Sequence, residues 1–263
     1  MGIMNSLTFG SVNTATYKTY ISGVKTYKIA ERDYEQIEIP GRNGYLLQDN
    51  NRFKPVVIEY DAFCVEDIQT NVRGLLNALL GQKGIVKLSD TYDVNHYRMG
   101  YYGGGVDPNV YMMRTARFTL QFVCQPERWL ELTPITITES TNFTNPTLFD
   151  AKPIITVTMA SGSSSGNLYV SRYVSGVRKD QWKITFSGIG NDIIMNCETM
   201  DFYDSNGNNL NSNVVILPTI TSGDINMEFP MFAGSSLSRV FTVDGGWDSA
   251  IASITVNPRW WEL

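Results

Sequence analysis

The chain has 263 residues, of which 43% are hydrophobic and 18% charged, so it can bury a sizeable core without disulfide or metal support. Its formal net charge of −5 argues against a protein that grips nucleic acid directly, because such binding needs clustered lysine and arginine. The three cysteines, Cys64, Cys124 and Cys197, lie in apolar contexts, and we expect free buried thiols and folding in a reducing cytoplasm. We expect no secretory signal and no membrane span, because no apolar run approaches the length that either needs.

The first half of the chain is expected to form a mainly β, sandwich-like domain, residues 1–132, with a single helix. Pro-Gly followed by Asn-Gly in residues 40–44 supplies two tight turns, so Arg42 and Asn43 should lie on an exposed loop. Alternating apolar residues and turn signals predict strands at residues 7–10, 20–24, 32–40, 54–65, 83–88 and 110–123.

Two segments between these strands have other patterns. Residues 66–80 carry apolar side chains at helical spacing, which predicts an amphipathic helix with Glu66 and Asp67 in its first turn and Gly81 just after its end. Residues 89–108 are polar, rich in tyrosine and interrupted by three glycines, and they predict a long loop that holds the only histidine, His96.

The stretch that ends this domain is residues 117–130. It begins as a strand with alternating apolar residues and stops at Pro126, which cannot donate a ladder hydrogen bond. The tail Pro126-Glu127-Arg128-Trp129 is echoed near the end of the chain by Pro258-Arg259-Trp260-Trp261. We infer two domains, each of which ends in a strand and a tail of Pro, Arg and Trp.

The second domain, residues 133–263, is predicted to be an antiparallel β-sandwich. It begins with a linker-like segment at residues 133–145, and turns such as the one at 204–209 separate its short strands. These strands are expected at residues 153–159, 167–170, 182–186, 192–196, 200–203, 214–217, 226–229, 240–243 and 252–257.

Evidence for enzymatic chemistry or a bound cofactor is thin. His96 has only Asp90 and Asp93 near it in sequence, which favours a solvated loop histidine over a catalytic or metal site. The calcium-like spacing that starts at Asp204 lacks the glycine and the terminal glutamate of a calcium loop. We therefore expect no catalytic residue, no metal and no cofactor. Four tryptophans are either core anchors or a sugar-stacking or protein-contact surface: Trp182, Trp247, Trp260 and Trp261.

The order of several short motifs resembles that of the distal tail proteins of siphoviruses, the long-tailed, non-contractile bacteriophages. The resemblance spans essentially the whole chain, although each piece is weak by itself. One turn departs from the family pattern, because Ser236 stands where asparagine is usual. The matching pieces are Phe9-Gly10, residues 39–44, Asn51-Arg52-Phe53, the helix leading into 81–88, Leu88-Ser89-Asp90, residues 92–102, 118–122, 124–129, Asn145-Pro146-Thr147, 152–157, 229–236 and Pro258-Arg259-Trp260-Trp261.

The resemblance implies a structural virion protein. Its first domain would form a homo-hexameric ring at the tail tip that joins the tail-tube protein to the tail-associated hub protein, with DNA passing through only in transit. Its second domain would be a galectin-like β-sandwich, which in some relatives carries receptor-binding proteins or binds host glycans. Assembly would take place in the cytoplasm of the host bacterium, without membrane insertion. The alternative is a carbohydrate-binding adhesin module that grips glycans through stacked tryptophans.

Two sets of contact residues follow from these expectations. Exposed Arg, Tyr and Gly content predicts an oligomer interface at Arg42, Asn43, Tyr92, Tyr97 and Tyr101. The repeated tail predicts an interdomain seam, because the ends of a domain often lie close together. The residues of this seam would be Arg128, Trp129, Arg259, Trp260 and Trp261.

Overall fold

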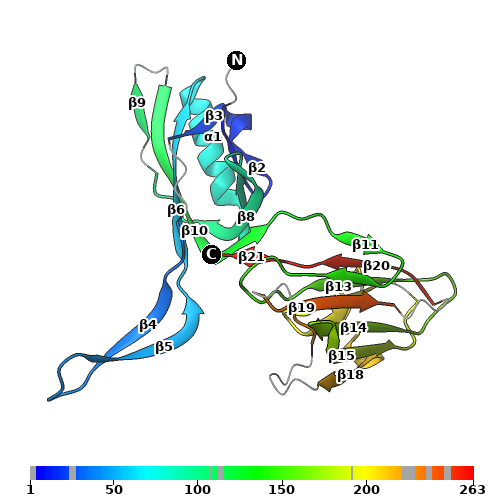
Figure 1. Ribbon diagram of the computed structural model, residues 1–263. Helices are drawn as coiled ribbons and strands as arrows, with labels where there is room; N and C mark the ends of the chain where they lie inside the picture. The colour runs from blue at the N-terminus through cyan, green and yellow to red at the C-terminus, as the bar shows by residue number, and fades with distance from the viewer. Residues whose placement is uncertain are drawn as a thin grey trace. The chain divides into compact units, whose positions relative to one another are not determined.

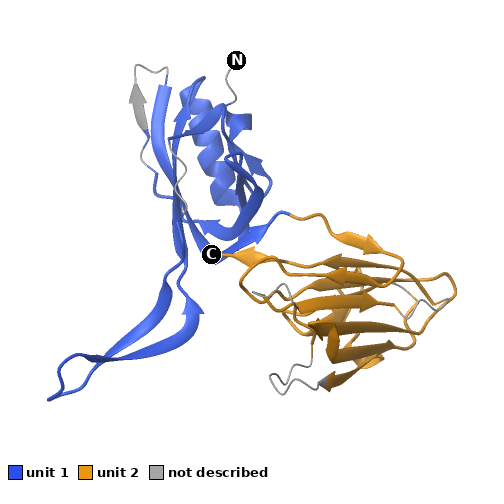
Figure 2. Ribbon diagram, in the orientation of Figure 1, with its two compact units in different colours: residues 1–131, 263 blue, residues 132–262 orange. Residues whose placement is uncertain are grey.

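The computed structural model describes residues 4–23, 28–106, 108–111, 115–190, 192–220, 229–234, 239–245 and 250–263. The chain divides into two compact units, residues 1–131 with Leu263 and residues 132–262 (Figure 2). Both units are built mainly from antiparallel strands (Figure 1), which confirms the predicted fold class. Among the described residues, no helix is long and apolar enough to cross a membrane.

Unit 1 is a curved antiparallel sheet with one helix packed on it. Its strands run in the order β2-β1-β7-β8-β10-β6-β3, and β9 pairs with β10. A separate ribbon is formed by β4 and β5. The elements are β1 (Leu7–Phe9), β2 (Val12–Asn13), the 3-10 helix η1 (Thr14–Tyr17), β3 (Thr19–Ser22), β4 (Arg32–Glu38), β5 (Tyr45–Phe53), β6 (Val56–Cys64), α1 (Ile68–Gly81), β7 (Val86–Asp90), β8 (Asp93–Tyr102), β9 (Asn109–Tyr111) and β10 (Thr115–Leu130).

The core of unit 1 lies between α1 and the sheet. On β10, buried residues alternate with exposed ones from Thr115 to Phe122, as the period-two pattern predicts. The fully buried Phe122 contacts the rings of Phe9 and Tyr102, with centroids 5.0 and 5.4 Å away. The helix contributes its buried stripe of Ile68, Val72, Leu75 and Leu79. The same apolar faces that the sequence displays therefore form this core.

Three local predictions for unit 1 were wrong. The helix begins at Ile68, so Glu66 and Asp67 precede its first turn, and Gly81 is its last residue, not the residue after it. Much of the predicted loop at residues 89–108 is the ten-residue strand β8. A strand also follows the predicted turn at residues 40–44, namely β5, which the sequence interpretation did not contain.

Unit 2 is a sandwich of two five-stranded sheets, in the orders β11-β20-β13-β16-β17 and β12-β19-β14-β15-β18. The predicted linker is wrong, because β11 and β12 lie within it and join one sheet each. The predicted strand at residues 226–229 lies almost entirely outside the described residues. The elements are β11 (Ile135–Ile137), β12 (Thr141–Phe143), β13 (Ile154–Met159), β14 (Gly166–Val174), β15 (Val177–Phe186), β16 (Ile193–Asn196), β17 (Asp201–Tyr203), η2 (Asn211–Asn213), β18 (Val214–Ile220), β19 (Arg239–Asp244), β20 (Ile251–Asn257) and β21 (Trp261–Glu262).

A buried asparagine fastens two loops of unit 2. The Asn145 side-chain amide donates to the carbonyl oxygens of Phe149 at 2.8 Å and Phe232 at 2.9 Å. Its oxygen accepts from the backbone N–H of Thr147 at 2.9 Å. Beside this tie, the Gly234 N–H donates to Asp150 at 2.8 Å. The two loops approach so closely that little room is left between their backbones.

Replacing Gly234 by alanine should destabilise unit 2 by about 1–3 kcal/mol, the usual cost of overpacking. A Cβ atom at Gly234 would lie 2.5 Å from the carbonyl carbon of Leu148 and 2.6 Å from its oxygen, and these backbone atoms cannot rotate away. Denaturant unfolding followed by circular dichroism measures the loss. The control is Gly81→Ala, where nothing lies within 4 Å of the added atom, so stability should hold or rise slightly. Equal stability of the Gly234→Ala variant and the native chain would contradict the crowding argument.

Candidate oligomerisation surface

The most unusual element of unit 1 is the two-stranded ribbon of β4 and β5. It extends away from the rest of the unit (Figure 1), and its strands pair only with each other in the described part of the chain. Glu38 lies opposite Tyr45, and the register holds back to Tyr34 opposite Asp49. The turn contains Gly41 and Gly44 at φ values of 82° and 87°, a conformation that glycine adopts without strain. The turn glycines of the sequence therefore fix the tip of this ribbon.

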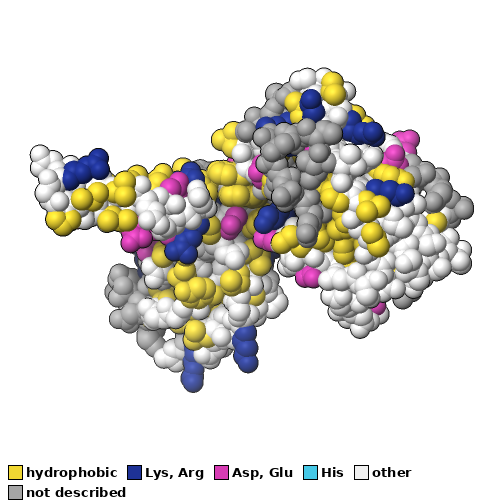
Figure 3. All heavy atoms as spheres, turned by 90° about the horizontal axis from the view of Figure 1, so that it is seen from below, with side chains coloured by type: hydrophobic (Ala, Val, Ile, Leu, Met, Phe, Trp, Pro, Cys, Tyr) yellow, Lys and Arg dark blue, Asp and Glu magenta, His cyan; other side chains and the backbone are white. Residues whose placement is uncertain are grey.

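Both faces of the ribbon carry exposed apolar side chains. Opposed residues share a face, which places Tyr34, Tyr45 and Leu47 on one side and Ile37 and Leu46 on the other. Each of these five side chains is between 36% and 55% exposed. Hydrophobic atoms run along the projecting ribbon in Figure 3. An isolated apolar residue on a surface is ordinary, but such a row on one thin element is typical of an interaction site.

Ion pairs hold the base of the ribbon in place of a core. Arg52 pairs with Asp33 at 2.7 Å and Arg32 pairs with Asp49 at 3.0 Å. The hydrogen bond from Arg52 lowers the pKa of Asp33, so the pair stays charged at neutral pH. A two-stranded ribbon alone in water is only marginally stable, so it needs contacts such as these ion pairs. The ion pairs lie at its base and do not cover its apolar faces. The ribbon is thus suited to pack against another surface.

The predicted interface residues lie on two different elements. Arg42 and Asn43 are exposed at the ribbon turn. Tyr92 precedes β8, and its hydroxyl donates to the carbonyl oxygens of Ile21 and Gly23 at 3.4 and 3.3 Å.

The two remaining tyrosines lie on β8. The Lys87 ammonium sits 4.5 Å from the ring centroid of Tyr97, and Tyr101 is 48% exposed. Their assignment to an interface stays a prediction. The residues that the sequence interpretation missed are Tyr45, Leu46 and Leu47, an apolar run immediately after the turn.

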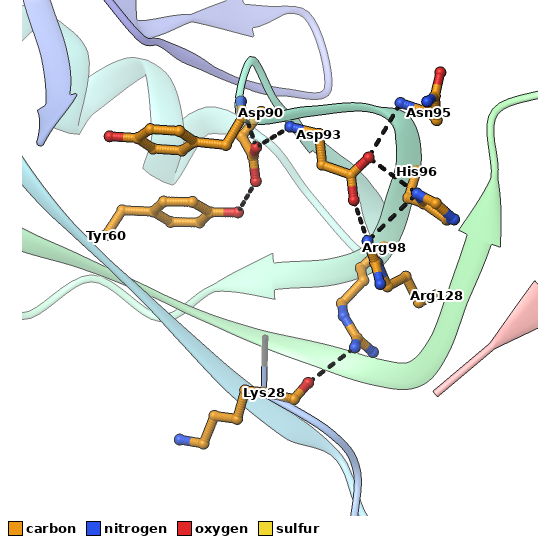
Figure 4. Close-up of polar contacts among 9 residues, drawn as sticks. Lys28, Tyr60, Asp90, Asp93, Asn95, His96, Arg98 and Arg128 are labelled. Atoms are coloured by element: carbon orange, nitrogen blue, oxygen red, sulfur yellow. Dashed lines mark hydrogen bonds and ion pairs between the residues drawn. The ribbon is translucent and has the colours of Figure 1, made fainter. Parts of the chain in front are cut away.

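His96 is not the solvated loop histidine that we expected. It lies on β8 with its side chain 21% exposed, and its Nδ1 atom is 3.0 Å from an Asp93 carboxylate oxygen (Figure 4). Arg128 of β10 forms an ion pair with the other oxygen of Asp93 and lies 3.3 Å from His96. The cluster therefore ties the start of β8 to the end of β10, where the pairing shifts register between Cys124 and Arg128. Among the described residues, no His, Cys, Asp and Glu side chains gather as a metal site.

A second set of contacts beside this cluster also holds neighbouring strands of the sheet together. Asp90 accepts from the Tyr60 hydroxyl at 2.7 Å, and burial is the main cause that raises the pKa of Tyr60. Arg98 donates to the carbonyl oxygens of Pro126 at 2.6 Å and Lys28 at 3.0 Å. Burial lowers the pKa of Arg98. Because these charges already have partners, the arrangement indicates a structural clamp around the register shift.

The four tryptophans that the structure describes are buried or pack against other side chains. Trp182, 4% exposed, is a core residue, so its sugar-stacking alternative is wrong, whereas Trp247 lies outside the described residues. Trp261 stacks on Phe149, with ring centroids 4.3 Å apart. Trp260 packs against the core of unit 2, and Arg259 forms an ion pair with Glu198. Trp129 is buried. The seam between these two tails stays a prediction.

Comparison with known proteins supports the fold. No protein-family profile and no curated protein sequence matches the chain. Among solved structures, the chain is similar to the Dit protein (gp 19.1) of phage SPP1, described as a paradigm of the hub adsorption apparatus in phages that infect Gram-positive bacteria. The match covers 97% of each chain with a TM-score of 0.65 at 14% sequence identity. The chain therefore has the fold of a phage hub protein along nearly its whole length.

Proposed function

We propose that this chain is a structural component of a bacteriophage tail tip. It would form a hexameric ring that joins the tail-tube protein to the tail-associated hub proteins and lets DNA pass through the ring. The observation that carries the proposal is the fold match to the SPP1 hub protein over 97% of both chains. The number six and the named partners come from the resemblance to distal tail proteins. The role as a virion component follows from the same comparison.

The ribbon of β4 and β5 suits the proposed ring. A ring needs a head-to-tail contact, in which each copy offers two unlike surfaces. The two faces of the ribbon are unlike, since one presents two tyrosines beside Leu47 and the other presents only the aliphatic Ile37 and Leu46 among its exposed apolar side chains. Its length and exposure would let one copy reach the next, with Arg42 and Asn43 at the leading end. We propose that the apolar faces of the ribbon become covered by neighbouring copies.

The outward face of β6 and β10 suits a passage for DNA. Exposed Glu59 and Asp61 accept hydrogen bonds from Gln121 at 3.0 Å and Thr119 at 2.9 Å. These bonds keep the two carboxylates fixed on the sheet surface. Acidic groups repel DNA phosphates, so a channel lined by this face would let the duplex slide without being held.

The mass of the purified full-length chain in solution tests the ring. Light scattering should give about six times the single-chain mass of 29.5 kDa, and negative-stain images should show closed rings with a central hole. If the chain requires a partner to close, addition of the tail-tube protein should produce the same rings. A chain that stays single both alone and with that protein would contradict the proposal.

A further inference from the structure

The sequence contains two Asn-Gly pairs, Asn43-Gly44 and Asn206-Gly207. An asparagine side chain reacts most readily with the backbone when glycine follows it, because glycine has no Cβ atom to hinder the attacking nitrogen. The first pair lies at the tip of the ribbon of β4 and β5, and the second lies in the turn after β17. Both asparagines are exposed to water. The two pairs differ in how firmly hydrogen bonds hold the turn.

A network of hydrogen bonds holds the turn around Asn206. The buried Asp204 carboxylate accepts from the backbone N–H groups of Asn206 at 2.9 Å and Asn208 at 2.8 Å. It also accepts from the Asn208 side-chain amide at 2.8 Å. The Gly207 N–H donates to the Asp204 carbonyl oxygen at 3.0 Å. The nitrogen that would have to attack the Asn206 side chain is therefore bonded to another group.

The ribbon tip lacks such a network. The Arg42 N–H donates to the Ile39 carbonyl oxygen at 3.1 Å. Within the part of the chain that the structure describes, neither the Asn43 side chain nor the Gly44 N–H has a hydrogen-bond partner. Gly44 has a φ value of 87°, and nothing lies within 4 Å of where its Cβ atom would be. The Gly44 nitrogen and the Asn43 side chain are therefore free to approach each other.

We propose that Asn43-Gly44 is a site of spontaneous self-modification, at which Asn43 loses its side-chain amide. The Gly44 nitrogen attacks the Asn43 Cγ atom, and the new C–N bond closes a succinimide ring. The side-chain nitrogen takes up the proton that the Gly44 nitrogen releases and leaves as ammonia. Water then adds to either carbonyl carbon of the ring and opens it, which gives aspartate or isoaspartate. The reaction needs water alone and no oxidant or cofactor.

Either product changes the tip of the ribbon. It places a carboxylate next to the exposed Arg42, and isoaspartate also lengthens the backbone within the turn. Because this turn sets Glu38 opposite Tyr45, a longer backbone disturbs the pairing at the end of the ribbon. The consequence for assembly rests on the proposed ring. A tip that reacts before assembly would fit the neighbouring copy less well, so aged chains would be left out of new rings.

The full-length chain, incubated at neutral and mildly alkaline pH, tests the modification. Peptide mapping by mass spectrometry follows asparagine, aspartate and isoaspartate at both Asn-Gly pairs of the same sample. Asn43 should react about tenfold faster than Asn206, the ratio expected where one site keeps a hydrogen bond that the other lacks. The rate at Asn43 should rise with pH, because the attacking nitrogen must lose its proton. In denaturant the two rates should converge, since only the fold separates the pairs.

Two outcomes would overturn the assignment of this site. One is a rate at Asn43 that is no faster than the rate at Asn206 in the folded chain. The other is a product at position 43 that contains no isoaspartate, because direct hydrolysis without the succinimide ring gives aspartate alone.

Light scattering of the incubated samples tests the effect on assembly, with Asn43→Ser as the matched variant that has no side-chain amide to lose. The incubated native chain should lose ring mass, whereas the incubated variant should keep it. Equal retention of mass by both would refute the effect on assembly. A freshly purified native chain that is single, alone and with the tail-tube protein, would refute the ring, and the peptide map would still decide whether Asn43 is modified.

Discussion

Replacing Leu46 and Leu47 together by aspartate should turn the proposed ring into single chains while the fold stays intact. The two side chains are 48% and 50% exposed and point to opposite faces of the ribbon. If both faces become covered on assembly, each aspartate would bury a charge without a partner, which costs several kcal/mol. Neither leucine belongs to the core of unit 1, so folding should not suffer.

The measurements are light scattering for mass and circular dichroism for the fold. The matched control is Leu217→Asp, because Leu217 is 55% exposed on β18 of unit 2 and makes no part of the ribbon. This control should assemble like the native chain. The role of the ribbon would be refuted if the double variant kept the native mass, or if the control disassembled to the same extent.

Breaking the buried ion pair of Arg172 and Asp180 should cost unit 2 about 3–5 kcal/mol of stability, whichever partner is removed. The Arg172 Nε atom donates to an Asp180 oxygen at 2.5 Å, and the side chains are only 9% and 2% exposed. They lie opposite each other on β14 and β15, in line with core residues such as Trp182. Either Arg172→Met or Asp180→Leu would leave a charge in apolar surroundings.

The double variant, Arg172→Met with Asp180→Leu, separates the cost of leaving one charge buried from the loss of the ion pair itself. With both charges removed, no unpaired ion is left, and most of the lost stability should return. Denaturant unfolding of the two single variants and the double variant measures this coupling. The control is the ion pair of Arg52 and Asp33, in which the Arg52 side chain is 73% exposed, so that Arg52→Met should cost the protein less stability because solvent screens the arginine. Additive losses in the double variant would show that the two residues act independently.

The sequence predicted most elements whose side chains meet a core, and it also predicted β4 of the ribbon, whose residues are almost all exposed. Alternation located β10 and most strands of the sandwich, and helical spacing located α1, because one buried face imposes its period on the chain. The ribbon has no core, so β5 shows no such period, and its polar residues 48–52 resembled a loop. β8 was missed for a related reason: only two of its ten residues are buried, and many of its side chains are polar.

The candidate surface was only half visible in the sequence. Turn chemistry placed Arg42 and Asn43 on an exposed loop, since glycine and proline act locally. The sequence does not predict the exposure of Tyr45, Leu46 and Leu47, because this exposure depends on which other elements pack against them. In the same way, His96 contacts Arg128 because β8 and β10 pair, although the two residues are more than thirty positions apart. Local sequence patterns do not predict such a long-range contact.

The place of β10 within its sheet also dictates the order in which the protein can fold during synthesis. β10 is the last long strand of unit 1, yet it lies between β8 and β6, and β20 has the same interior position between β11 and β13. A nascent chain that has not reached residue 130 therefore holds two strands with no neighbour between them and an unfinished apolar face. Each unit can complete its sheet only after its last interior strand has been synthesised, so the two units should finish folding late and one after the other. A chain that ends before β10 would expose unpaired sheet edges, which are prone to aggregation.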